Sequence, residues 1–381
     1  MNSDYQSGIK VGILGGGQLG RMFIQEALNL DVHVHILDPD TNAPCAKISH
    51  NFTLGDLKDF DTVYAFGKDK DVVTIEIEHV NVDALEKLAE EGVAVYPQPH
   101  LIRLIQDKGL QKDFYKQNNI PTAPYRITAS GEALENHADY LPFMMKARTG
   151  GYDGKGVQAI KSTADFSKAF DGPCVLESFV DFERELSVIV ARNKNGETIT
   201  YPIVELEYNT EANLVEFLFA PANVSKVTEE KAAAIAKDVI DKMGMIGLLA
   251  VEMFLTKDGE ILVNEVAPRP HNSGHQTIEA NFTSQYEQHL RSIINLPLGS
   301  TKAIMPSVMV NLLGEKNHYG KAKYDGLEDV LSWEGVFPHL YGKSDTKPFR
   351  KMGHVTIIND SLDSAKKIAL KVKETLKVIG E

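Results

Sequence analysis

The sequence has very few cysteines: Cys45 and Cys174 are the only two in 381 residues. Two cysteines cannot build a disulfide framework, and their spacing matches no zinc-binding motif. We therefore expect both to be buried packing residues. A reducing compartment, the cytoplasm, fits this cysteine usage best.

The chain also lacks an excess of positive charge and any long apolar run. Its 40 lysines and arginines stand against 53 aspartates and glutamates, which gives a formal net charge of −13. A nucleic-acid groove needs a basic stripe that meets phosphates, so we expect no nucleic-acid partner. No stretch approaches the length of a membrane span, and the N-terminus MNSDYQSGIK has no apolar signal region. We therefore expect no membrane partner, although a few lysines and arginines suffice for small phosphorylated ligands.

Strands alternate with helices over the first hundred residues. The apolar pattern predicts strands at 9–14, 32–37, 72–77 and 93–96, with helices at 21–30 and 81–91. This alternation indicates a parallel sheet that is covered on both faces. Further along, it predicts helices at 101–119, 228–243 and 361–377, strands at 142–147, 173–178 and 185–191, and a hairpin at 248–266. The length implies several domains, which we place at 1–100, 101–180, 181–305 and 306–381.

Residues 15–20 read GGGQLG between a predicted strand and a predicted helix, and Asp38 ends the next strand. Glycines at such a turn allow backbone N–H groups to approach a phosphate at the positive end of the helix. Alone, this motif is typical of an NAD(P)-dependent dehydrogenase. A doubly wound domain that binds another ligand fits it equally well.

A second glycine-rich segment, RTGGYDGKG at 148–156, follows Lys146 at the end of a strand. Four glycines in seven residues carry an entropic cost that a chance loop would avoid. We predict a flap that closes over nucleotide phosphates, since lysines flank the glycines. The segment is not a P-loop, because no G-K-[ST] follows it, and the alternative is a solvated surface hairpin.

The hairpin VEMFLTKDGEILVNE, at 251–265, contains Asp258-Gly259, the preferred pair for a two-residue type I′ turn. Counting outward from that turn places Glu252 opposite Glu265, and both faces of the hairpin are otherwise apolar. Two carboxylates directly across a strand pair repel each other unless a cation lies between them. Carboxylate ligands without cysteine or histidine suit Mg²⁺ shared with nucleotide phosphates. The alternative is that both carboxylates point to solvent.

Two polar segments follow the hairpin. The first, APRPHNSGH at 267–275, has prolines that fix an extended path, so that Arg269 can orient a small anion and stabilise the charge that develops on it. A structural turn whose histidines cap backbone groups is the alternative. The second segment is a basic cluster at 343–354, which could bind a phosphate monoester or could be a solvated loop. Its members are Lys343, Lys347, Arg350, Lys351 and His354.

In this order, the motifs resemble those of the N5-carboxyaminoimidazole ribonucleotide synthetases, an ATP-grasp family of bacterial and fungal purine synthesis. The matching segments are GGGQLGRM, RTGGYDGKG, the hairpin glutamates, NEVAPRPHNSGH and FRKMGH. The resemblance implies a mixed α/β and α+β chain, an ATP-grasp fold with an N-terminal Rossmann-like domain and a small C-terminal α/β domain. It also implies a homodimer that carboxylates 5-aminoimidazole ribonucleotide with bicarbonate while ATP is cleaved to ADP and phosphate.

The resemblance further implies roles for the matched residues in binding nucleotide and metal. ATP phosphates would contact Lys108, Lys146, Gly150, Gly151, Tyr152, Asp153, Gly154 and Gly156. The adenosine pocket would consist of Glu177, Ser178, Phe179, Val180 and Glu185. Mg²⁺, or Mn²⁺ in its place, would bind Glu252 and Glu265, with Asn264 beside them.

The other two substrates would be bound by matched residues from several segments. The ribonucleotide would contact Gln18, Leu19, Glu76, Tyr152, Asp153, Lys343 and Arg350. Bicarbonate and carboxyphosphate would contact Arg269, His271 and Asn272, and Lys155 would be a further catalytic residue.

The sequence departs from the family pattern at three places. Lys347-Pro348-Phe349 stands where the family tends to have Arg-Pro-Gly, and Lys155 stands where many relatives have arginine. Asn264 belongs to the matched motif, but strand alternation aims its side chain away from the face of the glutamate pair.

Three other functions remain open at this point. Formate-dependent glycinamide ribonucleotide transformylase shares the hairpin and the first-domain layout, but APRPHNSGH and FRKMGH favour the carboxylase. A dehydrogenase leaves the glutamate pair and the second glycine-rich segment unexplained. A non-catalytic nucleotide sensor would not need the anion-binding segment.

Overall fold

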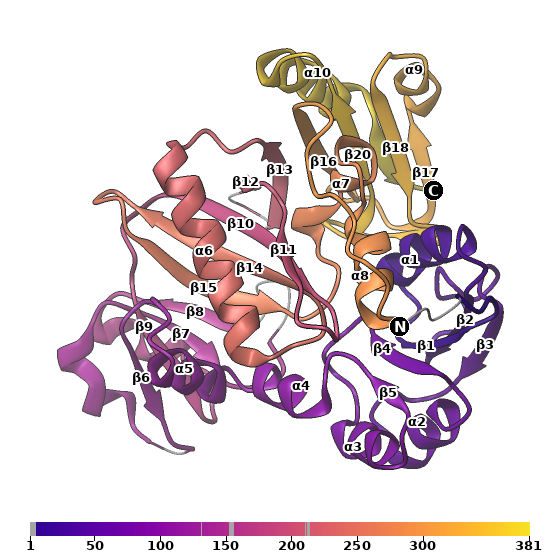
Figure 1. The fold of residues 1–381 in the computed structure, drawn as a ribbon. Coiled ribbons are helices and arrows are strands. Elements are labelled where there is room, and N and C mark those ends of the chain that lie inside the picture. The colour runs from indigo at the N-terminus through magenta and orange to yellow at the C-terminus, as the bar shows by residue number, and fades with distance from the viewer. Residues whose placement is uncertain (1–4, 131, 152–155, 210, 212–213) are drawn as a thin grey trace.

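The structure is a computed structural model that describes residues 5–130, 132–151, 156–209, 211 and 214–381. The strands of the described residues form four sheets (Figure 1). Among these described residues, no helix combines the length and the apolar character needed to cross a bilayer. Cys45 and Cys174 are both buried free thiols, as predicted.

The N-terminal sheet has five parallel strands in the order β3-β2-β1-β4-β5, which confirms the predicted parallel sheet. Its strands are β1 (Lys10–Leu14), β2 (His33–Asp38), β3 (Asn51–Leu54), β4 (Val72–Ile75) and β5 (Ala94–Val95). Its helices are α1 (Gln18–Leu28), α2 (Phe60–Gly67) and α3 (Val82–Glu90). Separate apolar cores lie on its two faces. The sequence did not predict α2 or β3, and no β3 residue is fully buried, so its apolar signal is weak.

The predicted single helix at 101–119 is two helices, α4 (Pro99–Gln106) and α5 (Lys108–Gln117). Asp107 separates them: its backbone is extended, and its carboxylate accepts hydrogen bonds from the N–H groups of Gly109 and Leu110 at 2.7 and 3.2 Å. Arg148 binds the same carboxylate through two nitrogens, at 2.8 and 2.6 Å. The break makes Lys108 the first residue of α5.

A four-stranded antiparallel sheet in the order β6-β9-β7-β8 follows α5. Its strands are β6 (Tyr125–Thr128), β7 (Phe143–Ala147), β8 (Val157–Ile160) and β9 (Cys174–Ser178). In sequence, the second glycine-rich segment lies between β7 and β8.

The largest sheet has nine strands in the order β15-β14-β10-β12-β13-β16-β20-β18, with β11 paired to β10. Its strands are β10 (Phe182–Arg192), β11 (Thr198–Thr200), β12 (Val204–Asn209), β13 (Leu214–Ala220), β14 (Gly247–Thr256), β15 (Ile261–Ala267), β16 (Ser307–Leu313), β18 (Val336–Leu340) and β20 (Lys351–Ile358). Because β13 pairs with β16, the sheet continues across the boundary that the sequence suggests at 305–306.

Helices cover both faces of the β10–β14–β15 part of this sheet. Helix α6 (Lys226–Met243) packs on one face, and α8 (Gln285–Ile293) lies on the other, between the sheet and α1 (Figure 1). The remaining α-helices and strands of the described residues are α7 (Thr277–Ala280), α9 (Leu327–Leu331), α10 (Leu362–Thr375) and the small sheet of β17 (Gly320–Asp325), β19 (Asp345–Thr346) and β21 (Lys377–Gly380). Helix α8 thus connects the largest sheet to the N-terminal domain.

Replacing Asp107 tests whether this cap stabilises the fold and places Lys108. Burial raises the pKa of Asp107, but hydrogen bonds from Arg148 and from the α5 backbone outweigh it, so the net pKa is lowered. The carboxylate therefore contributes stability above about pH 4, and this contribution is lost as the pH falls through the lowered pKa. We expect Asp107→Ala to reduce the free energy of unfolding at pH 7 by about 1–2 kcal/mol in urea titrations.

Asp59 provides the matched control, because it caps α2 in the same way through Thr62. We expect Asp59→Ala to lower the free energy of unfolding without changing nucleotide affinity. Asp107→Ala should lower both the free energy of unfolding and the nucleotide affinity. Equal nucleotide affinity in the two variants would contradict the proposed placement of Lys108.

Candidate active site

Glu252 and Glu265 lie directly opposite each other on β14 and β15, as the sequence predicts. The path to this register differs from the prediction. Thr256 pairs with Glu260, so the turn is a three-residue loop, with Gly259 at a φ of 83°. The predicted two-residue turn is therefore wrong, because Gly259 ends a longer loop of the kind that places glycine in the left-handed region.

A β-bulge restores the register that the longer loop would otherwise shift. Met253 pairs with Val263 while Glu252 pairs with Glu265, which leaves Asn264 as the extra residue. The bulge turns the Asn264 side chain toward the site, where its Oδ1 accepts a hydrogen bond from Lys146 Nζ at 3.0 Å. The expectation that Asn264 points away from the glutamate face is wrong, because simple alternation fails at a bulge.

The two carboxylates have opposite pKa shifts. Burial, followed by the charges of Glu265 and Glu185, raises the pKa of Glu252, whose exposed fraction is 8%. The ammonium of Lys108, 3.1 Å from Glu265 Oε2, is the main cause that lowers the pKa of Glu265. Glu185 on β10 also faces this cluster, and burial raises its pKa to about 7. Negative charge is thus concentrated beyond what the nearby lysines neutralise.

This excess of carboxylate oxygens fits a divalent cation such as Mg²⁺. Among the described residues, no group of three or more histidine, cysteine, aspartate or glutamate side chains is arranged to hold a metal ion alone. Mg²⁺ normally binds through one or two carboxylates and completes its shell with waters and substrate phosphates. Glu252 and Glu265 therefore suit a metal that a nucleotide would bring with it.

A row of buried charges supports Lys146 behind the glutamate pair. Glu177 bridges two lysines, with Oε2 2.8 Å from Lys146 Nζ and Oε1 3.1 Å from Lys112 Nζ. Lys112 also donates to Thr122 Oγ1 at 2.6 Å, and burial lowers its pKa to about 8. The sequence analysis missed Lys112, although it follows Lys108 by four residues and so lies on the same face of α5.

The residues predicted to hold adenosine lie where β9 leads into β10. The Glu177 side chain is engaged with the two lysines, so only its backbone remains for a base. Ser178 Oγ donates to Tyr140 Oη at 2.8 Å, and Phe179 is 40% exposed, next to Val180 in the connection. Their contacts with adenosine stay a prediction.

The described ends of the second glycine-rich segment, which the sequence predicts to be a flap, lie close together. Ala147 N–H donates to Gly156 O at 2.8 Å, and both Gly150 and Gly156 have positive φ, at 78° and 76°. Gly151 is partly exposed within it. The roles predicted for Tyr152, Asp153, Gly154 and Lys155 lie outside the described residues.

The first glycine motif holds a carboxylate of the protein itself. Glu76 accepts hydrogen bonds from the N–H groups of Gly17 and Leu19, at 2.5 and 3.0 Å, at the start of α1, where Gln18 is the first residue. Burial is the main cause that raises the pKa of Glu76, and these backbone hydrogen bonds oppose it. Asp38 accepts from Gly16 N–H at 2.7 Å. Because Glu76 fills the position that a pyrophosphate takes in dinucleotide-binding domains, the geometry does not favour the dehydrogenase.

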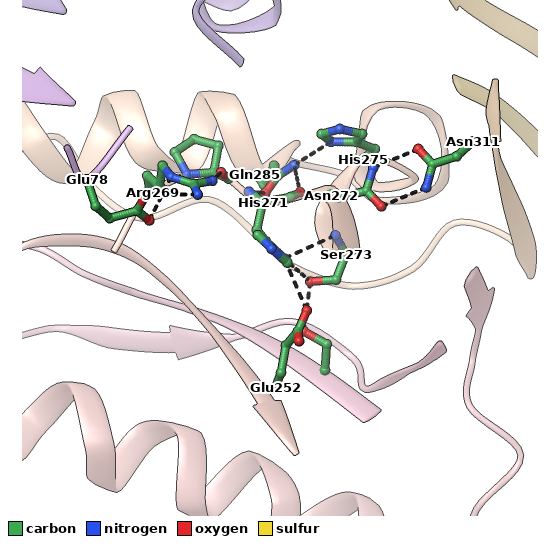
Figure 2. A network of polar contacts seen from close by, with 11 residues as sticks. Glu78, Glu252, Arg269, His271, Asn272, Ser273, His275, Gln285 and Asn311 are labelled. Carbon is green, nitrogen blue, oxygen red and sulfur yellow. Dashed lines mark hydrogen bonds and ion pairs between the residues drawn. The ribbon is translucent and has the colours of Figure 1, made fainter. Parts of the chain in front are cut away.

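The segment after β15 reaches three parts of the molecule (Figure 2). The Arg269 guanidinium pairs with both oxygens of Glu78, which follows β4, at 2.9 and 3.1 Å. His271 Nδ1 lies 3.7 Å from Glu252 Oε1 and 2.9 Å from Ser273 Oγ. The segment thus connects the glutamate pair to the N-terminal domain. Glu78 was missed by the sequence analysis, although it lies two residues after Glu76.

Asn272 is engaged with the C-terminal strands. Its side-chain amide exchanges two hydrogen bonds with that of Asn311 on β16, each 2.9 Å long. Asn311 also donates to Val215 O at 2.8 Å, which fixes the pair between β13 and β16. The contact of Asn272 with bicarbonate stays a prediction, and it would require this paired amide to rearrange.

The basic cluster at 343–354 has two parts. Lys343 and Arg350 belong to a loop, and Lys351 and His354 lie on β20. Lys343 Nζ donates to Lys351 O at 2.7 Å, and Arg350 Nη1 donates to Asp345 O at 2.6 Å, so the two predicted phosphate ligands belong to one loop. Lys351 lies near enough to lower the pKa of Glu252 by its charge. His354 is fully buried, and its pKa lies well below the usual range because of that burial. It is therefore a neutral packing residue and not a phosphate ligand.

The opposite pKa shifts predict opposite stability effects for the two hairpin glutamates in the presence of EDTA. The raised pKa of Glu252 means that its ionised form destabilises the fold increasingly as the pH rises above about 4, so Glu252→Gln should hold or raise the melting temperature at pH 8. The lowered pKa of Glu265 contributes stability above about pH 4, so Glu265→Gln should lower the melting temperature by about 2–4 °C. The reverse order in calorimetry would show that the charge assignment is wrong.

Comparisons with known families cover most of the chain. Residues 9–106 match the ribonucleotide synthetase preATP-grasp domain, residues 113–286 match the ATP-grasp domain, and residues 307–368 match the phosphoribosylaminoimidazole carboxylase C-terminal domain. The chain is 38% identical over 363 residues to N5-carboxyaminoimidazole ribonucleotide synthase of Bacillus subtilis (strain 168), covering 93% of each protein. It is 40% identical to the chloroplastic phosphoribosylaminoimidazole carboxylase of Vigna aconitifolia, of which it spans only 65%.

Solved structures agree with these matches. N5-carboxyaminoimidazole ribonucleotide synthetase from Thermotoga maritima superposes with a TM-score of 0.90 at 43% identity, covering 98% of this chain and all of that one. The Aspergillus clavatus enzyme, solved with ADP and 5-aminoimidazole ribonucleotide, gives a TM-score of 0.88 at 35% identity, covering 97% and 99% of the two chains. The predicted ATP-grasp fold, with its Rossmann-like N-terminal domain and its C-terminal domain, is confirmed. The chain belongs to the N5-carboxyaminoimidazole ribonucleotide synthase family, ATP-grasp ligases of purine biosynthesis.

Proposed function

We propose that this chain uses ATP and bicarbonate to carboxylate the exocyclic amine of 5-aminoimidazole ribonucleotide through carboxyphosphate. The observation that carries the proposal is the contact between His271 and Glu252, which joins the anion-binding segment to the carboxylate pair. An enzyme that transfers a phosphoryl group to bicarbonate needs these two sites side by side. The similarity to an enzyme that binds ADP and this ribonucleotide supports the choice of substrates.

The first step places the γ-phosphate of ATP between the lysines and the hairpin. Lys108 and Lys146 would neutralise its oxygens, and Glu252 and Glu265 would hold Mg²⁺, which supplies further positive charge when bound. Bicarbonate oxygen then attacks phosphorus in line. The new O–P bond forms as the bond to the bridging oxygen breaks, so the products are ADP and carboxyphosphate.

The second step moves carbon to the amine. Carboxyphosphate breaks into CO₂ and phosphate as its C–O bond to phosphate cleaves, the amine nitrogen attacks CO₂, and the nitrogen gives its proton to the released phosphate. Arg269, held by Glu78, and His271 would keep these species in place, and the glycine-rich flap would exclude water, which destroys carboxyphosphate. No protein nucleophile is required.

The ribonucleotide would lie between the N-terminal domain and the loop of the basic cluster. The N-terminal domain would contribute Gln18, Leu19 and Glu76, and the loop would contribute Lys343 and Arg350. A Cβ at Gly342 would lie 3.5 Å from Arg21 Nη1 of α1, so the loop and that helix are neighbours. This proximity supports a shared site for the phosphate and the imidazole ring.

The assembly and the location of the protein also belong to the proposal. A homodimer is implied by the family resemblance, and sedimentation velocity would test it. A cytoplasmic location is supported by the two free, buried cysteines, which suit a reducing compartment.

Measuring phosphate release with bicarbonate and with formate as the carbon substrate tests the proposed reaction. We expect phosphate from ATP to appear with bicarbonate and 5-aminoimidazole ribonucleotide, but not with formate and glycinamide ribonucleotide. The match of residues 307–368 to a carboxylase C-terminal domain is the reason for this choice. Release that depends on formate would instead assign the chain to the transformylase.

Arg269→Ala tests the anion-binding role. Loss of one fixed guanidinium should lower bicarbonate-dependent phosphate release by roughly 10²–10³-fold while ADP affinity, measured by calorimetry, stays nearly unchanged. Arg103→Ala is the matched control, since Arg103 forms a similar ion pair with Asp83 and Glu86 on the exposed surface of the N-terminal domain. Normal turnover in Arg269→Ala would leave Arg269 only a structural partner of Glu78.

A further inference from the structure

The segment that carries Arg269 and His271 is bound to α8 through the fully buried side chain of Gln285, the first residue of that helix. Gln285 Oε1 accepts a hydrogen bond from the backbone N–H of His271 at 2.9 Å, and its Nε2 donates to the backbone O of His271 at 2.8 Å (Figure 2). One amide group therefore pairs with both backbone polar groups of one residue.

The surroundings of Gln285 leave it a single position. Its backbone N–H donates to Thr277 Oγ1 at 2.8 Å, and its Nε2 lies 3.1 Å from His275 Nδ1. Burial keeps the pKa of His275 well below its usual range, so this ring is neutral, and its Nδ1 lies within hydrogen-bond distance of Gln285 Nε2 and of Tyr286 Oη, which is 3.0 Å away. A Cβ at Gly274 would collide with the Gln285 amide, so the segment fits closely against it.

The orientation of the His271 backbone matters because its ring stands beside the carboxylate pair. His271 Nδ1 is 3.7 Å from Glu252 Oε1 and 2.9 Å from Ser273 Oγ, which in turn lies 2.7 Å from Ser187 Oγ on β10. Rotation of the His271 backbone would carry the ring away from Glu252. It would also displace Arg269, two residues earlier in the chain.

We propose that Gln285 is a positioning residue for carboxyl transfer, a role that depends on the proposed function. Gln285 acts through His271 and Arg269: it fixes their backbone so that the ring and the guanidinium are presented together to carboxyphosphate. A misplacement of about 1 Å at such a site costs on the order of 10²-fold in rate.

The same helix contains a natural control. Gln288, also fully buried, pairs with Gly299 in the same way: Gly299 N–H donates to Gln288 Oε1 at 2.8 Å, and Gln288 Nε2 donates to Gly299 O at 3.1 Å. Gly299 lies in the connection after α8 and contacts none of the proposed site residues through this pair. Substitutions at Gln288 therefore measure the structural cost of losing such an amide.

The experiment compares Gln285→Glu and Gln285→Met with Gln288→Glu and Gln288→Met across a range of pH. A protonated carboxyl at position 285 keeps one acceptor and one donor for His271, whereas a carboxylate loses the donor and repels the backbone oxygen. Burial raises the pKa of a carboxyl, so the exchange falls in an accessible pH range. His271, His275 and Tyr286 are the titratable groups in contact with this position, and the wild-type profile corrects for them.

We expect Gln285→Met to lower kcat by roughly 10²-fold at every pH, with ADP affinity unchanged. Relative to wild type, Gln285→Glu should recover kcat as the pH falls. The Gln288 variants should lower the melting temperature while their kcat stays normal. Equal kcat losses at the two positions, or parallel pH profiles of Gln285→Glu and Gln285→Met, would overturn the positioning role.

The failure of the proposed function gives a different result. A wild-type protein without bicarbonate-dependent phosphate release would overturn that function, and this role with it, before any substitution is made. Normal wild-type turnover together with normal turnover in both Gln285 variants would overturn the positioning role alone.

Discussion

The repulsion between Glu252 and Glu265 is the constraint around which the rest of the site is built. A carboxylate pair set across a hairpin, with Glu185 nearby, is unfavourable unless positive charge surrounds it. The chain supplies that charge from elements on either side: Lys108 begins α5, and Lys146 is the next-to-last residue of β7. In the proposed mechanism, the negative charge that the lysines do not neutralise is available to bind a metal that comes with the nucleotide.

Several local irregularities exist because this cluster must be assembled from different elements. Asp107 interrupts a helix that the sequence pattern would continue, and the interruption places Lys108. A bulge turns Asn264 toward Lys146 instead of away from it. Each irregularity breaks a regular pattern in order to aim a side chain, which is the usual function of bulges and caps near active sites.

The segment after β15 contacts both the N-terminal domain and the C-terminal strands. Arg269 pairs with Glu78 of the N-terminal domain, Asn272 pairs with Asn311 of the C-terminal strands, and Gln285 holds the backbone between them. Movement of one domain would therefore disturb the side chains that we propose bind bicarbonate. Glu76 also links separate parts of the chain: its carboxylate binds the backbone of the first glycine motif, where a dinucleotide-binding enzyme would bind pyrophosphate.

The sequence by itself determined the parallel N-terminal sheet, the Glu252–Glu265 register and the family, because periodicity and motif order are local properties. The predicted Glu252–Glu265 register is correct although the predicted turn is wrong, because the extra residue in the loop and the extra residue at the bulge offset each other. The partners of Arg269, His271 and Asn272, and the buried Lys112 and Gln285, were decided only by the tertiary structure. These contacts join residues far apart in the chain, and their energies depend on burial and distance, which no local pattern encodes.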